Sequence, residues 1–168
     1  MNIFLRSVIS QDAPMLLRWR NDPETRRNSI NTGEVTPEEH ALWMNRVLVE
    51  DVYKAYVASA DDIPVGVVRL EFDFKEKTCD LSFTVAPERR GRGYGSAMVA
   101  HALHGLGDVC VTAEVKMFNQ ASRRIFDKLG FRVIDSAGEL LLYAKDMLDC
   151  STAPAAISLP NRNAIAHN

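Results

Sequence analysis

Three strand-like runs follow one another along the middle of the chain and constrain its fold more than any other feature. They span residues 53–60, 64–74 and 78–86, and short turns at 61–63 and 75–77 separate them. Connections this short join antiparallel neighbours, because a parallel pair needs a crossover of about a dozen residues or more. The last run alternates apolar with polar side chains, so one of its faces belongs to a core. The sequence therefore predicts an antiparallel meander at the centre of a sheet.

Helical and strand-like segments surround this meander in a definite order. We expect a strand at 2–9, a helix at 12–22, a short helix and loop at 23–35, a helix at 36–50, a helix at 95–107, a strand at 109–117, a helix at 119–130 and two closing strands within 131–147. A chain of 168 residues is long enough for one domain with a real core. The order β-α-α-β-β-β-α-β-α-β-β predicts an α/β (α+β) fold, a mixed and mostly antiparallel sheet flanked by about four helices.

Two helices carry recognisable start signals. In the segment 36–50, Thr36 is the expected cap, Pro37 takes the first helical position, and Glu39 completes a capping box. In the segment 12–22, Asp12 is the expected cap and Pro14 lies in the first turn. The buried stripe of the 36–50 helix is expected to contain Leu42, Trp43, Met44 and Val47.

Bulk charge and cysteine content exclude several classes of protein. The net charge is −2, so there is no general basic field for a nucleic acid, and any anion site must be local. Cys79, Cys110 and Cys150 are far apart and form no CxxC, which predicts neither a disulfide framework nor a metal site. No apolar run approaches the ~18 residues that span a bilayer, and the first residues lack the apolar core of a signal peptide. We therefore expect a cytoplasmic protein with no membrane or nucleic-acid partner.

The stretch VAPERRGRGYGSAM, residues 85–98, is the strongest candidate for a local anion site. Its glycines let backbone amides come close to a ligand, and the helix that begins there offers unpaired N–H groups and a partial positive charge. Together these features suit a pyrophosphate group. The glycine spacing matches neither the Walker loop nor the GxGxxG fingerprint. On its own, the stretch therefore leaves a solvated basic turn open as the alternative.

Two segments together resemble the GCN5-related N-acetyltransferase (GNAT) superfamily. The string RGRGYG at 90–95, after a strand that ends in Val-Ala-Pro, resembles the (Arg/Gln)-x-x-Gly-x-(Gly/Ala) pyrophosphate loop of that superfamily. The string NQASRRIFDKLGF at 119–131 resembles its N-x-x-(S/A)-x-x-x-(Y/F)-x-K-x-G-F segment. The resemblance implies the GNAT fold for residues 1–147, as an acetyltransferase domain. It leaves 148–168 as a C-terminal tail, which we expect to be mobile or to serve as an arm onto a partner.

The resemblance also implies acetyl-CoA as the acetyl donor, with no metal. Backbone amides of the glycine loop would bind the pyrophosphate, and the preceding strand would run beside the pantetheine arm where the sheet splays open. The 119–131 segment would contribute an amide to the pantetheine and an arginine, 123 or 124, to a phosphate. The residues so assigned are Phe83, Thr84, Val85, Arg90, Gly91, Arg92, Gly93, Tyr94, Gly95, Ser96, Asn119, Ser122 and Arg123.

Acetyl transfer to an amine needs a base for the amine proton, stabilisation of the oxyanion and a proton for the departing thiolate. Glu114, in the middle of its predicted strand, is the first candidate for the base. His40, on the helix at 36–50, is the second, and Asp80 and Glu71 are weaker alternatives. For each of these residues an ordinary solvated or ion-paired side chain stays open as the alternative.

The acid that protonates the thiolate is less clearly marked. Where many GNAT enzymes have a tyrosine, this chain has Phe126, which has no proton to donate. Either another group such as Tyr143 supplies the proton, or coenzyme A leaves as a thiolate that water protonates.

The acceptor is bound by the N-terminal third in this fold. The string Trp-Arg-Asn-Asp-Pro at 19–23, followed by Glu-Glu-His at 38–40, resembles the acetyltransferases of bacterial nonulosonic (pseudaminic) acid biosynthesis, which act on a UDP-linked 4-amino sugar. Guanidinium groups pair with phosphates and indoles stack on bases, although both tryptophans also suit a helix core. The candidate substrate-binding residues are Trp19, Arg20, Asn21, Arg26, Asn28 and Ser29.

Three other functions stay open at this point. The acceptor could instead be a protein N-terminus, as in the ribosomal-protein acetyltransferases, or another small-molecule amine. A function of a different class is a non-catalytic module that binds coenzyme A or RNA through the Arg-Gly loop. A homodimer is left open as well.

Overall fold

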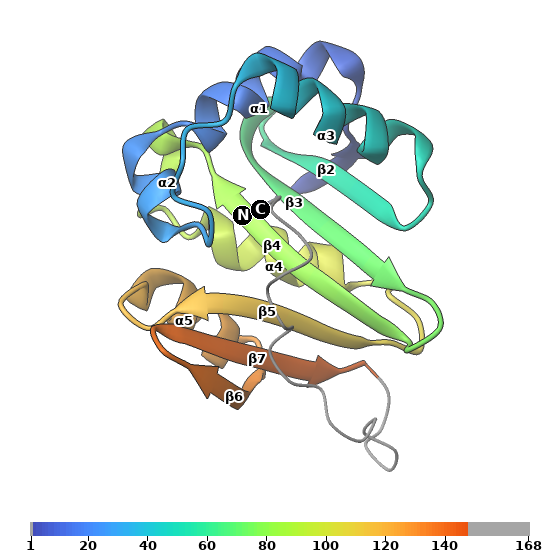
Figure 1. The fold of residues 1–168 in the computed structure, drawn as a ribbon, viewed down its shortest axis with the longest axis vertical. Coiled ribbons are helices and arrows are strands. Elements are labelled where there is room, and N and C mark those ends of the chain that lie inside the picture. The colour runs from blue at the N-terminus through green and yellow to red at the C-terminus, as the bar shows by residue number, and fades with distance from the viewer. Residues whose placement is uncertain (1, 148–168) are drawn as a thin grey trace.

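A seven-stranded sheet forms the centre of the structure (Figure 1). The structure is a computed structural model and describes residues 2–147 of the chain. Its strands lie in the order β1-β2-β3-β4-β5-β7-β6. They are β1 (Phe4–Ser7), β2 (Tyr53–Ala60), β3 (Ile63–Asp73), β4 (Thr78–Val85), β5 (Cys110–Lys116), β6 (Arg132–Ala137) and β7 (Leu140–Asp146). Every neighbouring pair is antiparallel except β4 and β5, which run parallel. The predicted mixed, mostly antiparallel sheet is therefore confirmed.

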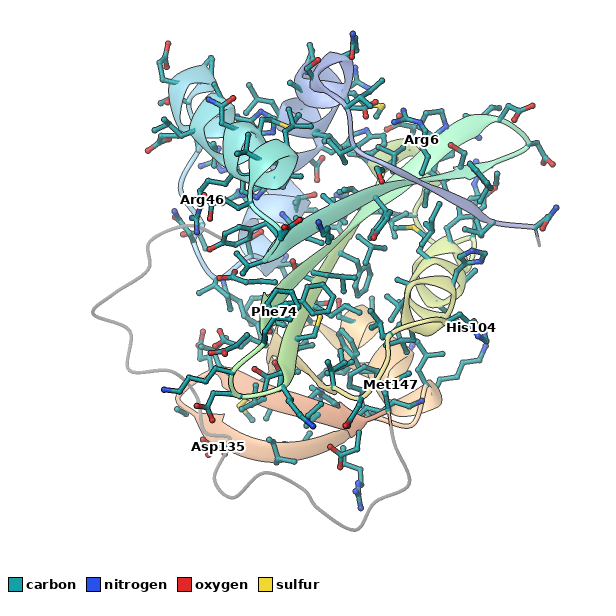
Figure 2. All side chains as sticks on the ribbon, turned by 90° about the vertical axis from the view of Figure 1, so that its right-hand side faces the viewer. Arg6, Arg46, Phe74, His104, Asp135 and Met147 are labelled. Carbon is teal, nitrogen blue, oxygen red and sulfur yellow. The ribbon has the colours of Figure 1, made fainter. Side chains whose placement is uncertain are left out.

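Helices cover both faces of this sheet. They are α1 (Ala13–Arg20), α2 (Pro23–Asn28), α3 (Pro37–Val49), α4 (Tyr94–Leu103) and α5 (Gln120–Lys128), with short 3-10 turns η1 (Ser10–Asp12) and η2 (Pro87–Arg89). The helices α1 and α3 pack on one face and α4 on the other (Figure 2). Among the described residues, no helix combines the length and the apolar character that crossing a membrane requires. The order of elements agrees with the prediction, and α4 ends before the predicted residue 107.

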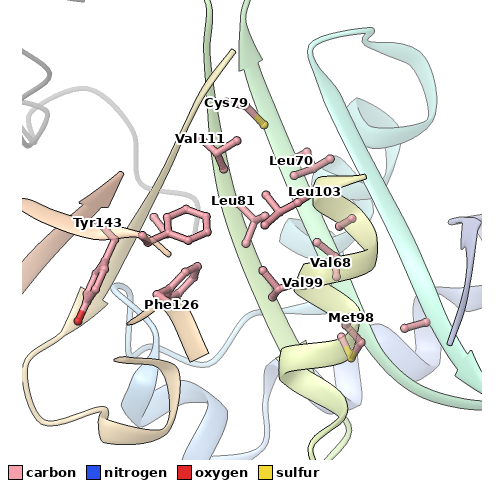
Figure 3. Close-up of a cluster of buried hydrophobic side chains, with 14 of the residues drawn as sticks. Val68, Leu70, Cys79, Leu81, Met98, Val99, Leu103, Val111, Phe126 and Tyr143 are labelled. Atoms are coloured by element: carbon pink, nitrogen blue, oxygen red, sulfur yellow. The ribbon is translucent and has the colours of Figure 1, made fainter. Parts of the chain in front are cut away.

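Buried apolar side chains form one cluster on each face of the sheet. Successive residues of β3 point to opposite faces, so Val67 joins the cluster under α1 and α3, whereas Val68 joins the cluster under α4. The larger cluster brings Leu81 of β4, Met98 of α4 and Phe126 of α5 together (Figure 3). Burial of apolar area, at roughly 25 cal/mol per Å², therefore fixes both helical layers to one sheet.

The start of α3 confirms the capping box, but its buried face differs from the prediction. The Glu39 amide donates to Thr36 Oγ1 at 3.2 Å, and the Thr36 amide donates to Glu39 Oε2 at 2.8 Å. Leu42, predicted for the buried stripe, is 64% exposed, whereas His40 and Met44 are buried. These two residues are four apart and so share one helix face, and that face meets the sheet. An apolar residue off this face stays in solvent.

Asp12 precedes α1 but its carboxylate does not cap the helix as predicted. It accepts hydrogen bonds from the Ile9 amide at 2.9 Å and from both terminal nitrogens of Arg6 at 2.7 Å. The bonded guanidinium of Arg6 holds the pKa of Asp12 below its usual value. The carboxylate therefore ties the end of β1 to the turn η1. The predicted tail, 148–168, lies outside the described residues, so the domain boundary at 147 stays a prediction.

A glycine in β3 marks the closest approach between the sheet and α4. A Cβ atom on Gly66 would lie 2.5 Å from Met98 Cε and 2.5 Å from the backbone oxygen of Thr84. The methionine can move, but the Thr84 carbonyl can move only with β4. We expect Gly66→Ala to lower the free energy of unfolding by roughly 1–3 kcal/mol in urea denaturation. Gly107→Ala is the control, since a Cβ there meets nothing within 4 Å. Equal midpoints for the two variants would contradict the close approach.

Candidate active site

The parallel strands β4 and β5 pair over a short stretch and then diverge. Thr78, Cys79 and Asp80 of β4 pair with residues 110–112 of β5, and the pairing stops there. Beyond it β4 stays bonded to β3, and β5 stays bonded to β7, so the sheet opens into a wedge (Figure 1). The facing edges of 81–85 and 113–116 are not bonded to each other. Backbone amides on such edges can bind an extended ligand.

A cavity of about 660 Å³, the β4–β5 cavity, occupies this wedge. Its walls come from β4, β5, the glycine loop, α2 and the start of α5. Many of the sequence-predicted site residues meet there, from segments far apart in the chain. They are Asn28, Ser29, Phe83, Thr84, Val85, Arg90, Gly91, Gly93, Tyr94, Gly95, Glu114, Asn119 and Ser122.

The glycine loop at one end of this cavity has a backbone that suits an anion. Gly91 and Gly93 have φ of 73° and 81°, in the left-handed region that favours glycine. Gly93 is the N-cap of α4, and no side chain caps that helix. A Cβ on Gly95 would lie 2.8 Å from Ile125 Cδ1, so glycine also permits the packing of α4 against α5. The loop therefore presents helix-start amides at the cavity wall.

The Arg90 side chain connects this loop to α2. It donates to Glu24 Oε2 at 3.0 Å, to Thr25 Oγ1 at 2.8 Å, and to Asp22 Oδ1. Asp22 also accepts from the Thr25 amide and so caps α2. Burial alone would raise the pKa of Asp22, but the bonds from Arg90 and Thr25 together lower it. The guanidinium of Arg90 thus bonds to α2 and to its cap Asp22, while residue 90 itself lines the β4–β5 cavity.

Two carboxylates lie at the closed end of the wedge. Asp80 is the last residue of β4 that pairs with β5, and its carboxylate accepts a hydrogen bond from Thr112 Oγ1 at 3.3 Å. Burial, with the charges of Glu114 and Glu71 nearby, raises the pKa of Asp80 to about 7. A carboxyl group with this pKa exchanges its proton near neutral pH, as a general base must. Glu114 lines the same cavity. Both carboxylates therefore stay candidates for the base, and Asp80, a weaker candidate from the sequence, is the one whose pKa lies near 7.

Arg69 is the site residue that the sequence reasoning missed. It lies in β3 between buried Val68 and Leu70, on the opposite face, and lines the β4–β5 cavity. Its Nη2 donates to Thr84 Oγ1 at 3.4 Å, and its buried Nε has no partner among the described residues. Burial, and then the nearby charge of Arg20, lowers the pKa of Arg69 to about 10. The available signal was an arginine directly between two apolar residues of a strand, Val68 and Leu70.

A second, smaller cavity of about 100 Å³, the α1–α3 cavity, adjoins the first. Arg69 and Thr84 line both. Trp19, Arg20 and His40, three of the predicted site residues, line the smaller one. Burial, and then the charge of Arg69, lowers the pKa of His40, so the imidazole is neutral at pH 7. His40 thus lies in a different cavity from Glu114.

The other predicted site residues line neither cavity. Asn21 is a predicted acceptor contact, but its amide group is bonded to the backbone of Val35 at 2.8 and 2.9 Å. Arg26 donates from Nε to the Thr32 carbonyl at 3.1 Å. Both side chains therefore shape the loop between α2 and α3. Arg92, Ser96 and Arg123, predicted at the cofactor, also lie away from the two cavities.

Neither a buried tyrosine nor a cysteine supplies further chemistry at the wedge. Tyr143 is 1% exposed and stacks on Phe126, 5.6 Å between ring centroids, within the core rather than at the cavity. Tyr143 therefore does not line the β4–β5 cavity, and the identity of the acid stays a prediction. Burial raises the pKa of Cys79 to about 12, so its thiol is no nucleophile near neutral pH. Residues 2–147 contain no cluster of three metal-ligating side chains.

Comparison with known proteins agrees with this geometry. Residues 2–132 match the acetyltransferase (GNAT) domain family. The chain belongs to the GNAT acetyltransferases. It is therefore an acyltransferase, and the fold that the glycine loop and the 119–131 segment imply is confirmed. No curated protein matches the chain in sequence.

Solved structures of GNAT enzymes share the fold at low sequence identity. Spermidine N-acetyltransferase from Vibrio cholerae, in complex with CoA and spermine, is 15% identical with a TM-score of 0.74, over 84% of this chain and 92% of that one. An acetyltransferase from Thermus thermophilus is 23% identical with a TM-score of 0.74, over 88% and 98%. An aminoglycoside acetyltransferase in complex with coenzyme A is 17% identical with a TM-score of 0.73, over 87% and 95%.

The Arg90 connection gives a test of how this GNAT enzyme orders its loop. We expect Arg90→Ala to lower the free energy of unfolding by about 1–3 kcal/mol, because Asp22 loses a largely buried charged partner. Coenzyme A affinity, measured by calorimetry, should fall as well. Arg18→Ala is the control, since its pair with Glu88 spans 4.0 Å between exposed side chains and contributes little. If the melting curve and the coenzyme A affinity of Arg90→Ala both equal those of the wild type, this role of Arg90 is refuted.

Proposed function

We propose that this GNAT enzyme transfers an acetyl group from acetyl-CoA to the amino group of a nucleotide-linked amino sugar. The observation that carries the proposal is the wedge between β4 and β5, with the glycine loop at its open end and Asp80 and Glu114 at its closed end. A donor anchored by its pyrophosphate at the loop would extend its thioester toward the carboxylates. The rest of the acceptor would lie toward α2.

The donor side is supported by the fit between the cavity and coenzyme A. Uncapped amides and left-handed glycines at the loop suit a pyrophosphate. The unpaired edge of β4 beyond Asp80 suits the amide groups of a pantetheine arm. Asn119 Oδ1 accepts from the Ser122 amide at 3.1 Å and so caps α5. Its NH₂ group, at the wall of the β4–β5 cavity, would then donate to the pantetheine.

The reaction follows from the groups at the closed end. The acceptor ammonium gives one proton to the Asp80 carboxylate, and the free amine attacks the thioester carbon. A backbone N–H of β4 stabilises the oxyanion. Collapse breaks the C–S bond, the nitrogen loses its second proton, and the departing thiolate takes up a proton through water. Burial is the larger cause of the raised pKa of Asp80. The negative charge of Glu114 raises that pKa further.

The acceptor side is supported by α2 and the loop beside it. Asn28 and Ser29 line the β4–β5 cavity and can bond sugar hydroxyls. Arg89 and Arg124 line it as well, but they lie beside the glycine loop and on α5, where they can pair with phosphates of the donor. The comparison proteins named for spermidine and aminoglycosides act on polycations. Arg20 and Arg69, which line the adjoining α1–α3 cavity, argue for an anionic acceptor instead.

Two alternatives keep the enzyme class and change the acceptor, to a protein N-terminus or to another small-molecule amine. A non-catalytic module that binds coenzyme A or RNA does not agree with membership of the GNAT acetyltransferases. A cytoplasmic location and a homodimer stay predictions.

The base can be assigned from pH–rate profiles with one acceptor throughout. We expect kcat/KM to rise with pH and to level off above about 7, because Asp80 must lose its proton to act. Asp80→Asn should lose this limb and about 100-fold in rate. Glu114→Gln should move the limb to lower pH, because it removes a charge that raises the pKa of Asp80. If His40→Ala alone abolishes the limb, the base is His40 and the assignment to Asp80 fails.

The acceptor can be identified by free-thiol release with a panel of amines, followed by mass spectrometry of the products. We expect acetylation of a UDP-linked 4-amino sugar at a higher kcat/KM than spermidine, an aminoglycoside or a peptide with a free N-terminus. Turnover of peptides alone would refute the sugar-nucleotide acceptor and keep the acetyltransferase. Hydrolysis of acetyl-CoA without any acceptor is the background to subtract.

A further inference from the structure

We propose that the α1–α3 cavity binds a small oxyanion of the acceptor, a carboxylate or a phosphate group, and that Arg69 is the residue that binds it. This inference rests on the proposed function, since it places the non-reacting end of the acceptor. It assigns a ligand to a cavity that the transfer reaction itself does not use.

Arg69 has a guanidinium whose hydrogen-bonding capacity is largely unused. Its Nε is buried without a partner among the described residues, and its bond to Thr84 Oγ1, at 3.4 Å, is long for an N–H···O bond. A guanidinium has five N–H donors in a planar fork that matches the two oxygens of a carboxylate or phosphate. Burying such a group without an anion is unfavourable, and the strand around it is apolar. An anionic ligand would supply the missing acceptor oxygens.

Two arginines and two glutamates line this cavity, and the charge of Glu39 partly compensates Arg20, so Arg69 is the cation left for an anion. Arg20, 8% exposed, lines it with Arg69, and the two guanidinium groups repel each other. The neutral His40 adds a further N–H donor. Glu39 also lines the cavity, and its carboxylate accepts from the Thr36 amide. The other acidic group on the wall, Glu34, lies 3.6 Å from Arg26 and is exposed.

The groups on the sheet side complete this inventory. Asp80 faces Arg69 from β4, and its charge raises the pKa of Arg69, opposing the effect of burial. Asp80 pairs in register with Glu71, two residues along β3 from Arg69, and both carboxylates have raised pKa values. A partly protonated Asp80 compensates the guanidinium incompletely, so the oxyanion has a net attraction to the arginine.

The size of the cavity selects the ligand group. About 100 Å³ is well below the ~300–1,000 Å³ of pockets that hold drug-sized molecules, so a nucleobase with its ribose does not fit. A carboxylate or a phosphate group does. Because Arg69 and Thr84 line both cavities, the oxyanion would lie next to the reacting amine. The acceptor would therefore carry, a few bonds from its amine, an oxyanion that is separate from the nucleotide pyrophosphate, with the amine toward Asp80 and Glu114.

Tryptophan fluorescence reads this site without any turnover. The sequence contains two tryptophans, Trp19 and Trp43, and both line the α1–α3 cavity. We would titrate the wild type with sodium acetate and with sodium phosphate, against sodium chloride at equal ionic strength. We expect a saturable change with acetate or phosphate and none with chloride. Saturation by acetate identifies a carboxylate ligand, and saturation by phosphate identifies a phosphate ligand.

The variant Arg69→Gln should bind the effective anion about 10- to 100-fold more weakly, while Arg69→Lys retains part of the affinity. Circular dichroism spectra of the same samples control for folding. Equal anion affinity in wild type and Arg69→Gln overturns the proposal. If Arg69→Gln does not fold, the wild-type titrations still test the proposal. Acetate and phosphate titration curves that match the chloride curve overturn the anion site. Loss of coenzyme A binding in the wild type would refute the proposed function and leave the anion result readable.

Discussion

The short parallel pairing between β4 and β5 is the constraint on which the rest of the site depends. Each strand is held along its other edge, β4 by β3 and β5 by β7, so neither can turn to close the gap. The apolar clusters keep α4 and α5 fixed on one face. The wedge therefore follows from the way the neighbouring strands and helices hold β4 and β5. This rigidity matters chemically, because donors held in place cost little reorganisation during the reaction.

Features that depend on local sequence could be predicted well. The capping box of Thr36 and Glu39 lies within one helical turn, and the left-handed glycines at 91 and 93 follow from a tight loop before a helix. Alternation along β4 identified its two faces correctly. These signals involve neighbours in the chain, whereas the pyrophosphate role of the loop came from the family resemblance and stays a prediction.

Features that depend on burial could not be ranked from the sequence. Asp80 is a strong base candidate because buried surroundings and two carboxylates on other strands surround it, and none of these is adjacent in sequence. The same holds for Arg69, whose neighbour Arg20 comes from α1. Asn21 shows the converse. Its residue type suggested a contact with a ligand, but its side-chain amide bonds to the backbone of Val35, fourteen residues further along the chain. Residue type alone did not distinguish contact with a substrate from support of the backbone.

Under the proposed function, the bond network of Arg90 would link the two substrates thermodynamically. Its backbone belongs to the donor loop, while its side chain fastens the first turn of α2, which borders the acceptor side. If donor binding orders this loop, the same bonds also order α2. Linkage is reciprocal, so an acceptor that orders α2 tightens donor binding by the same factor. One arginine thus makes positive heterotropic cooperativity between the two ligands an expected property of the fold.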